Sequence, residues 1–102
     1  MNLRDFGTWE VVSTQGNEDH WEMVLHWSYK GSAPEAMGRI GRTLEDEGKW
    51  TPVNKVGSGP GTERQWTFRG NDDKPWKAAL RYDAVAGASD QYTAVLKVNR
   101  NG

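Results

Sequence analysis

The sequence predicts an α+β fold in which one amphipathic helix packs on one face of an antiparallel sheet. Two observations carry this prediction. Polar and apolar residues alternate with a period of two in most of the chain, and the period becomes helical only over residues 33–47. Short turns between most of the strands indicate antiparallel neighbours, in the chain order β-β-α-β-β-β-β. A length of 102 residues suits a single domain spanning residues 1–102.

The first two strands are predicted at residues 8–14 and 20–30, joined by a polar turn at residues 15–19. Alternate residues of a strand point to opposite faces, so an apolar set on one parity marks the face turned to the core. In the second strand that set is Trp21, Met23, Leu25, Trp27 and Tyr29, and in the first it is Trp9 and Val11. The pair is expected to form a hairpin.

The helix has recognisable start and stop signals. Ser32 and Glu35 fit a capping box, in which each residue bonds the other's backbone N–H. Gly48 is the predicted stop. Gly38 and Gly41 each cost about 1 kcal/mol relative to alanine inside a helix, so a close approach of another element is expected there. The apolar face of the helix comprises Ala33, Ala36, Met37, Ile40 and Leu44.

Four further strands are predicted after the helix. The first, residues 50–56, contains Pro52 and is therefore expected at an edge of the sheet. A glycine-rich loop at residues 57–62 separates it from the others. The remaining strands alternate clearly and occupy residues 63–69, 76–84 and 91–99.

Tryptophan is the unusual feature of the composition. Apolar residues make up only 35% of the chain, but six tryptophans offset this shortage, because each large aromatic side chain buries roughly 150–250 Å². Five of the six share the inward phase and are expected in the core: Trp9, Trp21, Trp27, Trp66 and Trp76. Trp50 is only loosely phased. If the helix were too short to cover all of these rings, the tryptophans left exposed at one end would be the candidate binding site.

Composition and charge exclude several classes of function. The chain has no cysteine, which excludes disulfides, thiolate zinc sites and cysteine nucleophiles and favours a cytoplasmic location. No signal peptide or membrane-spanning run is expected. A net charge of −1 argues against nucleic-acid binding, although residues 1–48 are acidic and residues 49–102 basic.

No catalytic or metal-binding constellation is apparent. His20, Glu22 and His26 share one strand face, but the two histidines are roughly 20 Å apart along the strand, too far to share an ion. Ser28 lies about 7 Å from His26, beyond hydrogen-bond reach. The glycines at 57–62 do not match a phosphate-binding loop. We therefore expect no enzyme activity, metal or cofactor.

The leading interpretation is a small module that binds another protein, as an inhibitor, adaptor or immunity factor does. Outward-facing basic side chains are the candidate surface, because arginine is enriched at interface hot spots. A module binding a small ligand or a carbohydrate through an exposed tryptophan is the alternative, with Trp50 as the candidate. Homodimerisation is compatible with either. The candidate binding residues are Arg64, Arg69, Lys77, Arg81, Lys97 and Trp50.

Overall fold

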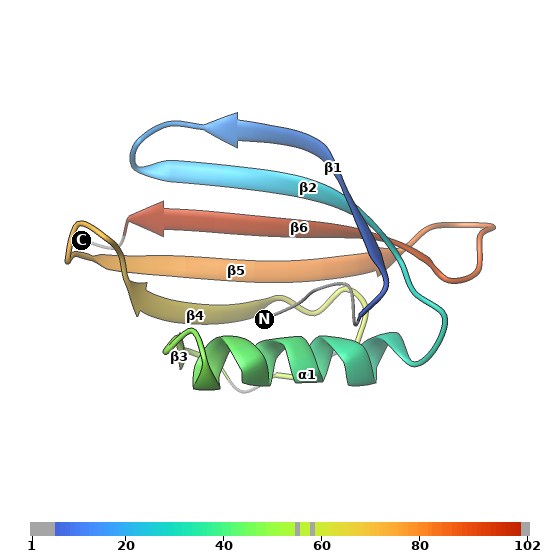
Figure 1. Ribbon diagram of the computed structural model, residues 1–102. Coiled ribbons are helices and arrows are strands. Elements are labelled where there is room, and N and C mark those ends of the chain that lie inside the picture. The colour runs from blue at the N-terminus through green and yellow to red at the C-terminus, as the bar shows by residue number, and fades with distance from the viewer. Residues whose placement is uncertain (1–5, 55, 58, 101–102) are drawn as a thin grey trace.

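The computed structural model describes residues 6–54, 56–57 and 59–100. These residues form one antiparallel sheet and one helix (Figure 1), which confirms the predicted fold class. The strand order is β1-β2-β6-β5-β4-β3, so the helix connects strands at different places in the sheet. The elements are β1 (Thr8–Gly16), β2 (His20–Ser28), α1 (Ala33–Asp46), β3 (Thr51–Pro52), β4 (Arg64–Arg69), β5 (Pro75–Ala84) and β6 (Gln91–Arg100).

The ends of α1 follow the predicted signals with two differences. Ser32 is the N-cap, and its Oγ accepts a hydrogen bond from Glu35 N at 3.3 Å. The Glu35 carboxylate, however, accepts a bond from Arg39 at 2.8 Å on the exposed helix surface. At the other end the left-handed residue is Lys49, with φ of 58°, one position after the predicted Gly48.

The core lies between α1 and the sheet face that we call the inner face. Trp27 is fully buried there, stacks on Trp9 with ring centroids 4.9 Å apart, and meets the edge of Tyr82 at 5.4 Å. Such aromatic pairs contribute about 0.5–1.5 kcal/mol each beyond their burial. From the helix, Met37 and Ile40 complete this buried layer.

The expectation that five tryptophans are core residues is only partly correct. The strand register places all five on the inner face, as their phase predicts. Only Trp27 and Trp66 are buried, whereas Trp9, Trp21 and Trp76 are half-buried. Figure 1 shows why: α1 runs beside β4, and β6, β2 and the end of β1 lie progressively farther from it. The helix covers one side of the inner face.

The two edge strands differ from each other. The predicted strand 50–56 shortens to β3, and the Asn54 side chain continues the pairing by accepting a hydrogen bond from Gln65 N at 3.0 Å. At the other edge, a bulge between Val11 and Ser13 interrupts β1. Val11 is 58% exposed although its phase predicted the core, because no helix covers that edge.

Candidate functional site

A groove remains open between α1 and the uncovered part of the inner face. It encloses about 170 Å³, and its eight lining residues are all apolar. Residues of the sheet form one side of the groove. Residues of α1, together with Trp50 beyond the end of the helix, form the other side. An apolar, partly enclosed space of this kind is the usual setting of a small-molecule site. The lining residues are Trp9, Met23, Leu25, Leu80 and Leu96 from the sheet, and Ile40, Leu44 and Trp50.

Trp50 is held at this groove by the chain around the helix stop. Its backbone N–H donates to Leu44 O at 3.1 Å, which fixes the residue beside the last helical turn. Its ring stacks on Phe68 with centroids 4.6 Å apart and nearly parallel planes. The one tryptophan whose phase was unclear is therefore half-buried and forms part of the groove wall.

Arg64 lies on the inner face, apart from the other basic candidates. Its side chain is only 17% exposed, and Nη1 donates to Met37 O at 3.2 Å. The guanidinium sits 5.3 Å from the centre of the Trp66 ring and 3.9 Å from the Glu45 carboxylate. It fills the space above Gly41, where an added Cβ would lie 2.4 Å from Nη1. These contacts attach the helix to the sheet and explain the helical glycine.

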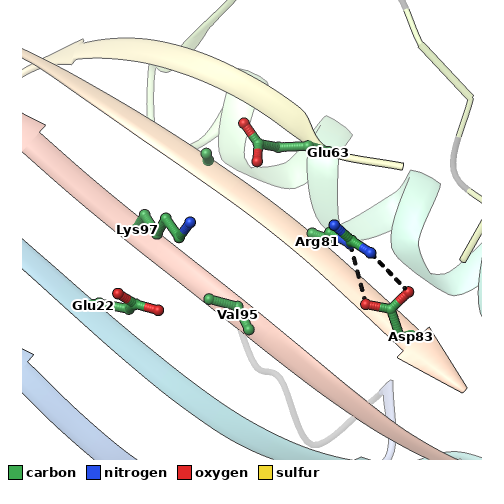
Figure 2. A pocket seen from close by; sticks show the side chains of 7 residues that line it. Glu22, Glu63, Arg81, Asp83, Val95 and Lys97 are labelled. Atoms are coloured by element: carbon green, nitrogen blue, oxygen red, sulfur yellow. Dashed lines mark hydrogen bonds and ion pairs between the residues drawn. The ribbon is translucent and has the colours of Figure 1, made fainter. Parts of the chain in front are cut away.

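The opposite, outer face of the sheet holds a shallow hollow of about 190 Å³ (Figure 2). Its floor consists of small or β-branched residues, Ala79 and Val95, and its rim carries charges of both signs. Arg81 and Lys97 supply the positive charges. Glu22, Glu63 and Asp83 supply the negative ones, so the surface is of mixed charge rather than basic.

The four outward basic candidates do not form one cluster. Arg81 and Lys97 lie together at the hollow, and Arg81 is bound to Asp83 at 3.1 Å. Arg69 lies at the end of β4 and bonds Asp73 O at 2.7 Å. Lys77 is on the outer face of β5 opposite Thr67 and Asn99. Two of the four thus have an intramolecular carboxylate partner.

The outward histidines of β2 do not assemble a metal centre. The side chain of His20 is hydrogen-bonded through Nδ1 to Asn99 Oδ1 on the neighbouring strand. Within the described residues no group of three or more histidine, cysteine, aspartate or glutamate side chains could hold a metal ion. Nor is any helix there long and apolar enough to cross a membrane.

The carboxylate of Asp72, in the turn between β4 and β5, accepts several hydrogen bonds. Asp72 accepts bonds from Trp76 Nε1 and Lys74 N, both at 3.1 Å, and from Arg100 Nη2 at 3.2 Å. These donors lower the pKa of Asp72, with the Trp76 bond the largest cause. Arg100 also reaches Asp19 at 3.4 Å, so the group ties together two turns and the end of β6.

Sequence reasoning missed most of the groove residues as a site. Met23, Leu25, Leu44 and Leu96 look like ordinary core residues, because phase gives the face of a residue but not what covers that face. The acidic rim of the outer hollow was detectable in part. Asp83 follows Arg81 by two residues on one strand and so shares its face.

No family model, curated protein or solved structure shows significant similarity to this chain.

Proposed function

We propose that this protein binds a small apolar ligand in the inner groove and has no catalytic step of its own. The observation that carries this proposal is the all-apolar lining of a partly enclosed space of about 170 Å³. Engineered apolar cavities of about 150 Å³ stay dry and bind benzene, so the space is large enough for a ring or a short chain. A ligand with polar groups at this point would lose hydrogen bonds to water without replacement.

Two half-buried tryptophans support the same proposal. Trp9 and Trp50 are half-buried at the groove, and a ligand between them would remove apolar surface from water at about 25 cal/mol per Å². A carbohydrate fits less well, because a sugar ring needs polar partners beside the aromatic platform and this lining offers none.

The test is a titration with iodobenzene, an apolar probe whose heavy atom quenches nearby tryptophans. We expect quenching and a rise in the unfolding temperature with probe concentration. A Leu44→Trp variant fills the groove from the helix side and should abolish both effects. The matched control is Val24→Trp on the outer face of β2, which should keep both. Equal binding by wild type and Leu44→Trp would refute the site.

Binding of another protein through the outer face is the second candidate function. The charge pattern favours it: small and branched side chains surrounded by charges of both signs resemble the apolar centre and polar rim of an interface. Lys77 and Lys97 form no ion pair within the described residues, so they are the cations most free to meet an acidic partner surface. A Lys77→Glu/Lys97→Glu variant should lose a partner that wild type retains in a pull-down. If the reversed protein retains the same partners, this second candidate is wrong.

A further inference from the structure

The edge of the sheet at β1 is open to solvent. Among the described residues β1 pairs with β2 alone, and Figure 1 shows most of it on the side of the sheet opposite α1. Its nine residues include one charge, Glu10, and neither lysine nor proline. Near its centre Val11 and Val12 are 58% and 65% exposed. Edge strands are commonly kept from pairing by shortness, proline or charge, and β1 has little of this protection.

The opposite edge of the sheet is protected. β3 has only two residues, and one of them is Pro52, which has no N–H to donate to a further strand. Pairing between edges is therefore available at β1 and not at β3. An association through β1 alone closes at two chains rather than continuing into a fibre.

The register shows which backbone groups of β1 point to the open side. In an antiparallel pair, residues alternate between those bonded to the neighbouring strand and those turned away from it. Asn17 N donates across the hairpin to β2 at 2.7 Å, and from there every second residue of β1, Gln15 and then Ser13, faces β2. Thr14 and Gly16 therefore direct their N–H and C=O groups to the open side.

The bulge shifts this alternation by one residue. Val11 pairs with Leu25 and Ser13 with Val24, so Val12 is an extra residue in β1. Because Val24 faces β1, its neighbour Leu25 does not, and Val11 opposite Leu25 points outward again. The outward residues are thus separated by two, three and two positions: Trp9, Val11, Thr14 and Gly16.

This spacing selects the partner. A regular strand presents backbone groups at every second residue, so it stays in step with β1 on only one side of the bulge. A second copy of β1 in antiparallel orientation carries the same spacing, because two, three and two reads the same backwards. A twofold axis at the bond between Val12 and Ser13 places Val11 opposite Thr14 of the second copy, on both sides of the axis.

The side chains fit the same register. Glu10 comes opposite Gln15 of the second copy, so the one charge of each strand meets a neutral amide rather than its own copy. Trp9 comes opposite Gly16, which has no side chain to compete with the ring. The exposed Val12 of each copy lies at the centre. No like charges are opposed anywhere along the pair.

We propose that two copies of this protein associate through antiparallel pairing of β1 with β1, about a twofold axis between Val12 and Ser13, and so form one sheet across both chains. The proposal does not rest on ligand binding, because it uses the backbone of the edge strand and not the inner groove.

The experiment is sedimentation velocity of the full chain over a concentration series. One strand pair is a small interface, so the dissociation constant is expected between about 10 μM and about 1 mM. We expect a reversible equilibrium of monomer and dimer in this range. A wild type that remains monomeric at about 1 mM overturns the proposal.

Two substitutions block the edge without removing a group that faces β2. Thr14→Pro removes an outward N–H, and Val12→Lys puts charge at the centre of the pair. Each should weaken the dimer by about tenfold or more, since every loss occurs twice by symmetry. The matched control is Val53→Lys, at a position 51% exposed beside β3, which should leave the affinity unchanged. Urea melts show whether each variant is folded, and Val12→Lys carries the test if Thr14→Pro is not. A dimer that persists in the folded variants overturns the proposal.

A charge test checks the register. Gln15→Glu would oppose Glu10 of the second copy at two places and should weaken the dimer by about two- to thirtyfold, whereas Gln15→Lys should strengthen it by a similar factor. Equal effects of the two substitutions would mean that Gln15 and Glu10 are not opposed, and the proposed pairing would be wrong.

Discussion

The contact between Arg64 and Gly41 predicts that Gly41→Ala lowers the stability of the wild type but raises the stability of a variant without the Arg64 guanidinium. In an ordinary helix Gly→Ala stabilises by about 1 kcal/mol. Here the new Cβ would lie 2.4 Å from Arg64 Nη1 and 2.7 Å from Cζ, well inside contact distance. The guanidinium must move, and it then leaves Met37 O and the Trp66 ring. We expect Gly41→Ala to destabilise the protein despite its better helix propensity.

The magnitude follows from the bonds that are lost. A hydrogen bond to a charged group contributes about 1.5–3 kcal/mol, and a cation over an aromatic ring about 0.5–2 kcal/mol. Partial loss of both, less the propensity gain of about 1 kcal/mol, leaves a net cost near 1 kcal/mol. Arg64→Leu removes the guanidinium and should cost about 2 kcal/mol. In that background Gly41→Ala should stabilise by up to about 1 kcal/mol, because the clash is gone.

The assay is urea unfolding of the wild type, both single variants and the double variant. The coupling free energy of the cycle should be about 2 kcal/mol, within the range for contacting residues. At this chain length each 1 kcal/mol corresponds to a shift of roughly 4–8 °C in Tm, so thermal melts provide an independent check. If Gly41→Ala stabilises both backgrounds equally, the guanidinium does not occupy the space above the helix and the reasoning is refuted.

Three further predictions concern the helix cap and two titrating groups. Ser32→Ala removes the acceptor of the Glu35 N–H and should cost about 1 kcal/mol in urea unfolding, whereas Ser32→Asp should retain most of the stability. Asp72 has a lowered pKa when folded, so its contribution is present above about pH 4 and is lost as pH falls through the folded pKa. Asp72→Asn should therefore flatten the dependence of Tm on pH between about 2 and 5; an unchanged slope would contradict this. Burial raises the pKa of Tyr82, so stability should fall as pH rises above about 10. Tyr82→Phe should weaken that fall, which denaturant melts across the alkaline range can measure.

The periodicity of the sequence was sufficient to predict the faces of the strands. Trp27 and Trp66 are buried and Arg81 and Lys97 face outward, because alternation along a strand depends only on local backbone geometry. The Ser32 cap was predictable for the same reason, since it involves residues three positions apart. The faces of the strands and the helix cap could be predicted without knowing the order of the strands in the sheet.

Expectations that depended on neighbouring elements were less successful. The sequence shows the inward phase of Arg64 but not its contact with the helix, because nothing local indicates a helix carbonyl 27 residues away. Asp73 and Asp83 neutralise part of the basic surface through contacts made by the turn and the strand. The protein partner, the absence of catalysis and the cytoplasmic location remain predictions, since they depend on molecules outside this chain.

The open groove follows from the difference in size between the sheet and the helix, and the sequence predicts the number and length of these elements. Six strands spaced about 4.8 Å apart make a sheet about 24 Å wide, whereas a helix with its side chains is about 10–12 Å across. A helix of 14 residues is also only about 21 Å long, against about 33 Å for a ten-residue strand. One helix therefore cannot cover an inner face that carries Trp9, Trp21 and Trp76. Because the remaining apolar surface is exposed without a ligand, a molecule that fills it should raise the free energy of unfolding in proportion to the area it covers. The groove thus links the tryptophan content of the chain to binding as well as to folding.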